Sequence, residues 1–284
     1  MRENLRDSLC RDTRGEYTFY IKRPAVTQGT NVVAAISYDP EKEYASYKIL
    51  QPYLKMPRVR LLNHREDPRL VIEGIDGEPV AGLIEKDINR AVLASEAFWD
   101  DTLKMWKETV QPADETKYSR QMRQEKSKSL DKLMENDFVK AHLDLPVVVN
   151  EIEYPTLRKT IALAKEALEE VESTMVIKHG DEQVDNVLAT RDGDYRVIDP
   201  AWRGVVGYGP PSFPVNLFIG TNYNFYYHWQ EEHTMNGAAN IKLDLQPRSR
   251  ATHGEFHPLY KRLLDELAII SPSNQFKENL FENF

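Results

Sequence analysis

The sequence predicts an α+β fold in two lobes: a small antiparallel β-sheet with one helix, followed by a larger and mainly helical part. Two observations support this prediction. Short segments rich in β-branched and aromatic residues dominate the first 77 residues. Beyond residue 77, apolar residues recur with a period of about 3.6 over long stretches, which is typical of amphipathic helices. We therefore expect an N-terminal domain over 1–77 and a C-terminal domain over 78–284.

The N-terminal elements are expected in the order β-β-α-β-β. Four segments rich in β-branched, aromatic or aliphatic residues are expected to form strands: Tyr17–Lys22, Asn31–Ile36, Val59–Leu62 and Leu70–Ile72. A helix is expected to begin at Pro40, because proline fits the first helical position and Asp39 is a good N-cap residue. This order indicates a small antiparallel sheet with one helix across it.

Helices and short strands are expected to alternate after residue 77. Apolar residues at helical spacing predict helices over 84–106, 120–143 and 157–171, and a mostly helical tail over 217–284. Three short strands are expected: Met175–Ile177, Val187–Ala189 and Tyr195–Ile198. The last two flank Arg191–Asp194, whose Asp-Gly pair is typical of a hairpin turn. A cleft between the two lobes is the expected place for a ligand.

Composition excludes several classes of protein. The chain has 37 Lys and Arg against 45 Asp and Glu, a net charge of −8, which argues against a dedicated nucleic-acid-binding protein. A single cysteine, Cys10, excludes an internal disulfide framework and suits a reducing compartment. No apolar run approaches the roughly 20 residues of a membrane-spanning helix. We expect a soluble cytoplasmic protein without nucleic-acid or membrane partners.

The segment His179–Leu188, with the sequence HGDEQVDNVL, is the most informative stretch. Phosphoryl transfer from a nucleotide needs a carboxylate to accept the proton of the attacking hydroxyl, and oxygen ligands for Mg²⁺. Asp181 is the predicted catalytic base, and Asn186 and Asp199 are the predicted Mg²⁺ ligands. The alternative is a solvated turn in which Asp199 merely caps a helix. That alternative does not explain why these residues and the intervening hairpin occur in this order.

These residues resemble the aminoglycoside phosphotransferase and choline-kinase-like group of small-molecule kinases. The motif H-G-D-x-x-x-x-N-V-L, a hairpin and then V-I-D are the main features shared. Weaker similarity covers Glu43–Leu50, which is similar to the family's αC helix, and Leu70–Gly77, which is similar to its interlobe hinge. The resemblance implies a protein-kinase-like fold and Mg²⁺-dependent transfer of the γ-phosphate of ATP to a hydroxyl of a small molecule. A sugar, an aminoglycoside-like antibiotic or an amino alcohol is the implied acceptor.

The resemblance also implies roles for residues around the motif. His179 is expected to shape the catalytic loop through backbone hydrogen bonds, without a chemical role. Glu182 and Asp185 are expected to face solvent. The backbone of Glu73 and Ile75 is expected to meet the nucleotide base at the hinge.

A lysine on the third strand, paired with a glutamate of the helix, touches the phosphates in this family. Lys22 is the only strand lysine available for that role, and Glu43 is its expected partner; otherwise Lys22 is an exposed residue at a strand end. If Leu5–Arg11 is the first strand, Lys22 lies on the second strand and Val32–Ile36 is the third. If the lobe is shortened, Lys22 itself lies on the third strand and a long insertion follows. We favour the first arrangement because it accounts for the length of the lobe and for both predicted strands.

Two other functions stay open, a divergent protein kinase and a nucleotide-binding pseudokinase. Gly180 stands where protein kinases carry arginine, and no Ala-Pro-Glu element follows, which argues against a protein kinase. The phosphate-covering loop has only Gly15, with Arg14 beside it, which keeps the pseudokinase open. Glu231, Glu232 and the aromatic run Asn222–Trp229 are candidates for the wall of an acceptor pocket.

Overall fold

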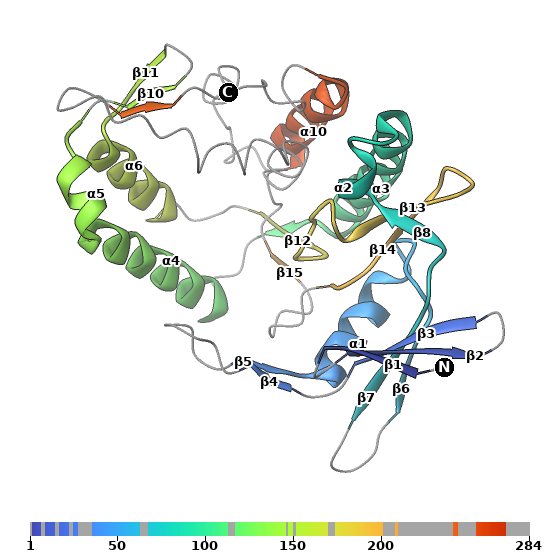
Figure 1. Cartoon of the computed structure of the whole chain (residues 1–284). Helices are drawn as coiled ribbons and strands as arrows, with labels where there is room; N and C mark the ends of the chain where they lie inside the picture. Colours follow the sequence, from blue (N-terminus) through green and yellow to red (C-terminus); the bar gives the residue numbers. More distant parts are fainter. Residues whose placement is uncertain are drawn as a thin grey trace. The chain divides into compact units, whose positions relative to one another are not determined.

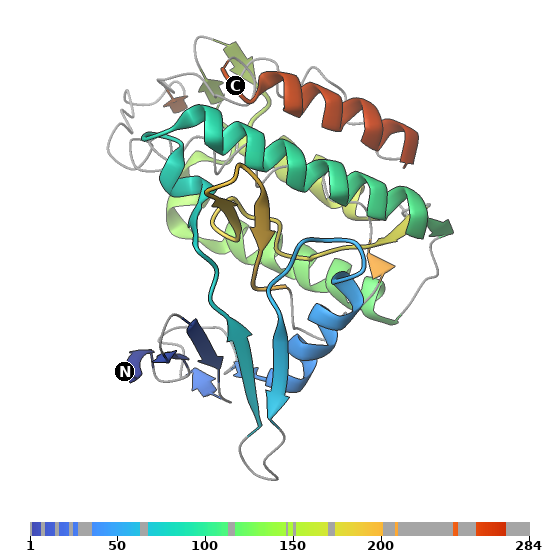
Figure 2. The same cartoon turned by 90° about the vertical axis from the view of Figure 1, so that its right-hand side faces the viewer.

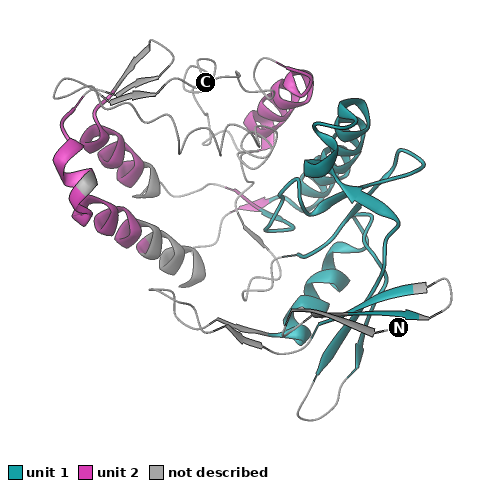
Figure 3. Ribbon diagram, in the orientation of Figure 1, with its two compact units in different colours: residues 1–110, 176–209 teal, residues 111–175, 210–284 magenta. Residues whose placement is uncertain are grey.

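The structure of the chain is a computed structural model. It describes residues 2–6, 9–14, 17–22, 25–27, 36–62, 68–112, 117–145, 147–149, 152–169, 174–200, 208–209, 241–243 and 254–270. The chain divides into two compact units (Figure 3). Unit 1 combines residues 1–110 and 176–209, and unit 2 combines residues 111–175 and 210–284. The predicted domain boundary at residue 77 lies inside unit 1 and stays a prediction.

Unit 1 contains a five-stranded antiparallel sheet (Figure 1). Its strands are β1 (Arg2–Arg6), β2 (Leu9–Arg14), β3 (Tyr17–Lys22), β6 (Val59–Leu62) and β7 (Arg69–Glu73), in the spatial order β1-β2-β3-β7-β6. Lys22 at the end of β3 lies opposite Leu70 of β7. The predicted strands at β3, β6 and β7 are confirmed. The single strand predicted over Leu5–Arg11 is wrong, because β1 ends at Arg6 and β2 begins at Leu9.

Helix α1 (Pro40–Leu50) packs against β6 and β7 and begins where the sequence predicts. The carboxylate of Asp39 accepts the backbone N–H groups of Glu41 and Lys42, at 3.0 and 3.3 Å, and so caps two of the orphan donors of the first turn. Tyr47 of α1 is fully buried with Leu70 and Ile72 of the sheet. Burying each such side chain contributes about 1.5–3 kcal/mol, which fixes α1 on this face of the sheet.

The described strands between β3 and α1 belong to a separate sheet. These strands, β4 (Ala25–Thr27) and β5 (Ile36–Tyr38), pair with each other as a two-stranded sheet. Residues 31–35 of the predicted strand over 31–36 lie outside the described residues, and Ile36 belongs to β5.

Unit 1 also contains a three-stranded sheet that is covered by a long helix. β8 (Gly77–Pro79), β13 (Val187–Thr190) and β14 (Tyr195–Val197) pair in the order β14-β13-β8. After the short helix α2 (Val80–Leu83), helix α3 (Ile88–Thr109) lies across this hairpin (Figure 2). The ring of Phe98 meets the ring of Tyr195 edge to face, 5.6 Å apart. The predicted β13–β14 hairpin is confirmed, since the Thr190 N–H donates to the Asp194 carbonyl at 2.8 Å.

Unit 2 is mainly helical in its described residues. Its helices are α4 (Lys117–Glu135), α5 (Asp137–His142), α6 (Leu157–Glu169) and α10 (His257–Ile270). Its short strands are β9 (Gln111–Pro112), β10 (Val147–Val149), β11 (Ile152–Tyr154) and β16 (Ile241–Leu243), while β12 (Thr174–Ile177) and β15 (Tyr208–Gly209) lie at the limits of the two units. The helix predicted over 120–143 is divided at Asn136 into α4 and α5.

The predicted α+β class is confirmed by the small antiparallel sheet with its helix and by the many helices. None of the helices in the described part of the chain is long and apolar enough to cross a membrane. Several predictions lie outside the described residues: Gly15, the aromatic run over 222–229, Glu231 and Glu232. The same holds for the side chain of Arg14, although its backbone ends β2.

Candidate functional site

A lysine and two carboxylates from three separate segments meet in unit 1. The ammonium Nζ of Lys22 lies 2.8 Å from Glu43 Oε1 and 2.6 Å from Asp199 Oδ1. Glu43 is buried on α1, whereas the Lys22 and Asp199 side chains are 18% and 47% exposed. Burial disfavours the charged form of Lys22, but the two carboxylates outweigh it, and the pKa of Lys22 is raised. The group therefore keeps a cation beside a solvent-accessible carboxylate.

The position of Lys22 corrects the arrangement of strands favoured from the sequence. Lys22 ends β3, which is the third strand along the chain, because β1 and β2 both precede it. The predicted Lys22–Glu43 pair is present in the structure, and the interpretation of Lys22 as an exposed strand-end residue is wrong. The alternative arrangement is correct in placing Lys22 on the third strand with a long insertion after it, but the lobe is not shortened, because β1 and β2 precede β3. The long insertion between Lys22 and Glu43 contains β4 and β5.

Asp199 follows β14 in a strained backbone conformation. Its φ of 55° lies in the left-handed region, which costs a residue with a Cβ about 1–2 kcal/mol. Asparagine and aspartate tolerate this region better than other non-glycine residues. Surrounding contacts must hold such a residue in place, and its backbone N–H donates to the hydroxyl of Tyr47 at 3.2 Å.

The predicted base Asp181 is held by two amide side chains of its own loop. Asn186 Nδ2 donates to Asp181 Oδ2 at 2.9 Å and to the Asp181 carbonyl at 3.0 Å. Gln183 Nε2 donates to Asp181 Oδ1 at 2.7 Å. Two donors fix the plane of this carboxylate, and the remaining lone pairs of its oxygens can still accept a proton. The structure thus places the amide of Asn186 in direct contact with the carboxylate of Asp181.

The loop over His179–Asn186 is also shaped by groups inside it. Gly180 has a φ of 84°, a conformation that favours glycine, and its N–H donates to Glu182 Oε1 at 3.0 Å. Glu182 is buried, so the prediction that it faces solvent is wrong, whereas Asp185 is exposed as predicted. Burial lowers the pKa of His179, and the Glu182 and Asp181 carboxylates oppose this shift. The imidazole of His179 is buried, but neither of its ring nitrogens has a hydrogen-bond partner among the described residues, so the backbone hydrogen bonds expected of His179 are not observed.

The donor groups of Asn186 and Asp199 fit a magnesium ion. Because Asn186 donates to Asp181 through its nitrogen Nδ2, its oxygen Oδ1 is left as the group that can bind a cation. Asp199 adds a half-exposed carboxylate. In proteins Mg²⁺ takes one or two carboxylates and completes its shell with water and phosphate oxygens, so a larger protein cage is not required. No cluster of three or more His, Cys, Asp or Glu side chains able to hold a metal occurs within the described residues.

One of the two predicted hinge residues, Glu73, has other contacts. Two guanidinium nitrogens of Arg58, Nε and Nη2, donate to the Glu73 carboxylate, the shortest distance being 2.7 Å. The Glu73 N–H donates to the Arg58 carbonyl at 2.9 Å. The backbone of Glu73 can therefore bind a nucleotide base only through its carbonyl oxygen. Ile75 follows β7 and is half-buried. Base recognition by either residue stays a prediction.

Two residues that contact the site, Tyr47 and Gln183, were not among those predicted from the sequence. Tyr47 lies four residues after Glu43 and therefore on the same face of α1. This spacing would have predicted that Tyr47 lies beside Glu43. Gln183 lies two residues after Asp181, and nothing in that spacing distinguishes it from Asp185.

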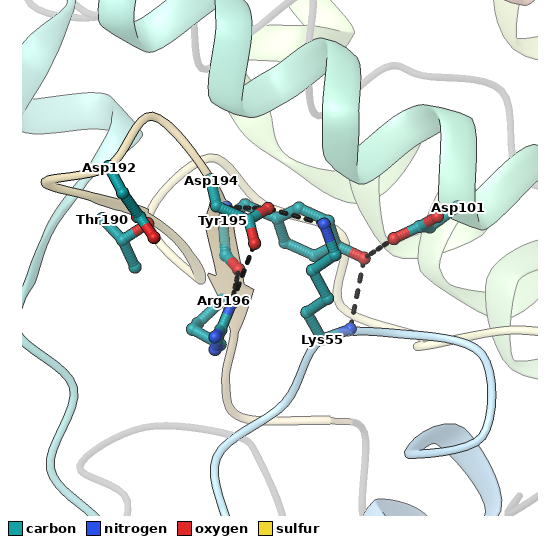
Figure 4. A network of polar contacts seen from close by, with 7 residues as sticks. All are labelled: Lys55, Asp101, Thr190, Asp192, Asp194, Tyr195 and Arg196. Carbon is teal, nitrogen blue, oxygen red and sulfur yellow. Dashed lines mark hydrogen bonds and ion pairs between the residues drawn. The ribbon is translucent and has the colours of Figure 1, made fainter.

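A polar network supports the hairpin that leads to Asp199 (Figure 4). The buried hydroxyl of Tyr195 donates to Asp101 Oδ2 at 2.7 Å and accepts the Lys55 backbone N–H at 3.2 Å. Lys55 Nζ lies 2.7 Å from Asp194 Oδ1. Burial raises the pKa of Tyr195, and so does its hydrogen bond to the Asp101 carboxylate. The network joins α3, the hairpin and the segment that follows α1.

Comparisons with known proteins add little to this geometry. No protein-family profile and no curated protein matches the sequence. Among solved structures, the chain is similar to the crystal structure of an aminoglycoside-3'-phosphotransferase of type VIII, with 17% sequence identity over 70% of each chain and a TM-score of 0.39. We therefore base the functional proposal on the site itself.

Proposed function

We propose that this chain is an ATP- and Mg²⁺-dependent phosphotransferase that acts on a hydroxyl group of a small molecule. One observation supports the proposal most directly: Lys22, Glu43 and Asp199 meet in the same compact unit that holds the Asp181–Asn186 pair. A cation for phosphates, oxygen ligands for a metal and a carboxylate for a hydroxyl proton are the groups that phosphoryl transfer needs. A cytoplasmic location, where ATP is supplied, is part of the proposal.

Each group has a separate role in the proposed reaction. Lys22, held by Glu43, binds phosphate oxygens of the nucleotide. Asn186 and Asp199 would hold Mg²⁺, which neutralises charge on the transferring group when bound. The acceptor oxygen forms a bond to the γ-phosphorus, the bond from that phosphorus to the β–γ bridging oxygen breaks, and ADP leaves. Asp181 orients the acceptor hydroxyl and takes its proton.

A small acceptor is favoured over a protein by the catalytic loop. Gly180 replaces the arginine of protein kinases, and its positive φ explains why a residue with a side chain is disfavoured here. A sugar, an aminoglycoside-like antibiotic or an amino alcohol carries the hydroxyl that this chemistry requires.

The test is ADP release from Mg·ATP in the presence of pooled small hydroxyl compounds, with a purified mixture of unrelated proteins as a second acceptor set. Release stimulated by the small compounds supports the proposal. Robust transfer to protein alone makes the chain a protein kinase, and Mg·ATP binding without transfer makes it a pseudokinase. Asp199→Ala should abolish both turnover and the dependence of nucleotide binding on Mg²⁺. Asp192→Ala, which changes an exposed carboxylate of the nearby hairpin, is the control and should retain both.

A further inference from the structure

Three consecutive backbone N–H groups at the end of β14 donate to three different parts of unit 1. The bonds are Val197 to the Lys55 carbonyl at 2.9 Å, Ile198 to the Asn186 carbonyl at 3.0 Å, and Asp199 to the Tyr47 hydroxyl at 3.2 Å. The first two acceptors are backbone carbonyls, which any residue provides. The third is a side chain, so the bond to Asp199 depends on the identity of residue 47.

Tyr47 lies where it can affect both halves of the phosphate-binding group. It lies on the same face of α1 as Glu43, and both side chains are fully buried. Helix α1 therefore holds Lys22 through Glu43 and the Asp199 backbone through Tyr47. Burial and the nearby carboxylates of Glu43 and Asp199 raise the pKa of Tyr47, so its hydroxyl stays neutral at physiological pH.

We propose that Tyr47 is a positioning residue for Asp199: its hydroxyl holds Asp199 in the left-handed conformation that keeps this carboxylate beside Lys22 and available to Mg²⁺. The proposal rests on the proposed function, because only there is Asp199 a metal ligand. Tyr47 itself contacts neither metal nor nucleotide in this role. It acts through the backbone of a residue whose conformation is unfavourable without support.

The first experiment uses the full chain without metal or nucleotide. Tyr47→Phe removes only the hydroxyl and keeps the buried ring, so the fold is expected to persist. Amide hydrogen exchange measured by NMR should be at least about tenfold faster at Asp199 in this variant, while Val197 and Ile198 keep their protection, because their acceptors are unchanged. An unchanged Asp199 exchange rate would overturn the proposal.

The second experiment measures the Mg²⁺ concentration needed for half-maximal binding of a non-hydrolysable ATP analogue. A typical intramolecular hydrogen bond corresponds to roughly a three- to tenfold change in an equilibrium, so Tyr47→Phe should raise this concentration by that factor. Nucleotide binding without Mg²⁺ should stay within about twofold of the wild type. An unchanged Mg²⁺ requirement in a wild type that binds Mg·nucleotide would also overturn the positioning role.

Tyr195→Phe is the matched control. It removes another buried tyrosine hydroxyl from unit 1, one that contacts Lys55 and Asp101 and not Asp199. It should lower the stability of the fold yet leave the Mg²⁺ requirement and the Asp199 exchange rate within about twofold of the wild type. If both variants changed the Mg²⁺ requirement and the Asp199 exchange rate equally, the cause would be a general loosening of the fold. That result would overturn the proposal. If the wild type binds no Mg·nucleotide, the proposed function fails, whereas the exchange experiment still decides whether Tyr47 holds Asp199.

Discussion

The ammonium group of Lys22 lies 2.8 Å from the carboxylate of Glu43, a residue that is fully buried on the helix facing the sheet. A buried carboxylate is strongly unfavourable unless a partner compensates its charge. The pair therefore couples the position of α1 to the end of β3. A fold that depended on packing alone would place an apolar residue at position 43.

Replacing Lys22 by methionine should destabilise the protein. Removing one partner of a buried pair leaves the other charge uncompensated, and since Lys22 keeps some exposure we expect a loss of about 2–3 kcal/mol in the free energy of unfolding. The double variant Lys22→Met, Glu43→Gln should recover at least half of it, because the isolated charge is gone. Urea unfolding measures both. Lys42→Met, at an exposed position of α1, is the control, and a Lys22 variant as stable as this control would contradict the prediction.

Asp181→Asn should remove nearly all phosphoryl transfer while nucleotide binding stays close to that of the wild type. A positioned general base contributes roughly 10²–10⁴ in rate, and asparagine keeps the size of the side chain without its basicity. Asp185→Asn makes the same chemical change at an exposed position of the same loop and should stay within about twofold of the wild-type rate. Steady-state ADP release measures both variants. Retention of more than about a tenth of the rate by Asp181→Asn would exclude the role.

Gly74 and Gly82 should respond in opposite ways to replacement by alanine. A Cβ added at Gly74 would lie 2.6 Å from the Thr18 carbonyl oxygen, the same atom that accepts the Gly74 N–H. The backbone must shift, which should cost about 1–3 kcal/mol of stability. At Gly82 in α2 nothing lies within 4 Å, so alanine should be neutral or stabilise the helix by up to about 1 kcal/mol. Thermal unfolding of both variants checks the prediction. A destabilised Gly82→Ala and an unaffected Gly74→Ala would contradict it.

The Glu73–Arg58 pair should contribute to stability near neutral pH and not in acid. Hydrogen bonds from Arg58 lower the pKa of Glu73 below its ordinary value of 4.5, and its partial burial opposes the shift. Its contribution is therefore present above the unfolded-state pKa and is lost as the pH falls through the lower pKa of the folded state. Both side chains are partly exposed, so we expect less than about 1 kcal/mol.

Urea unfolding of Glu73→Gln should accordingly show a loss near neutral pH that disappears in the acid range. Glu255→Gln, at an exposed position of unit 2, should follow the wild type throughout. A loss at Glu73 that is equally large at both pH values would indicate packing rather than charge.

Local sequence patterns were sufficient to predict a helix start or a turn whose conformation depends on one or two residues. Asp39 and Pro40 start α1 as expected, and the Asp-Gly pair of the hairpin turn lies between β13 and β14. The strand that carries Lys22 was assigned the wrong place in the order. The segment Arg2–Arg6, with the sequence RENLR, has no alternation of apolar and polar residues, so only its pairing with β2 reveals it as a strand.

The candidate site was predictable in its residues more than in its contacts. The Lys22–Glu43 pair was expected from the resemblance to small-molecule kinases, whereas the motif identified Asp181 and Asn186 without the hydrogen bond that joins them. The burial of Glu182 did not, because it depends on how a loop with a glycine of positive φ folds back on itself.

Unit 1 is assembled from two stretches of chain that are separated by residues 111–175. On the ribosome, β8 therefore emerges long before its partner β13. Tyr47 likewise emerges before Asp199, whose backbone N–H donates to the Tyr47 hydroxyl. A nascent chain that has reached only Val110 carries Lys22 and Glu43 but lacks β13 and β14, which pair with β8, and Asp199, the third member of the charged group. Assembly of the site therefore waits until Asp199 has been translated, and a truncated product that ends before Val187 has no means of forming it.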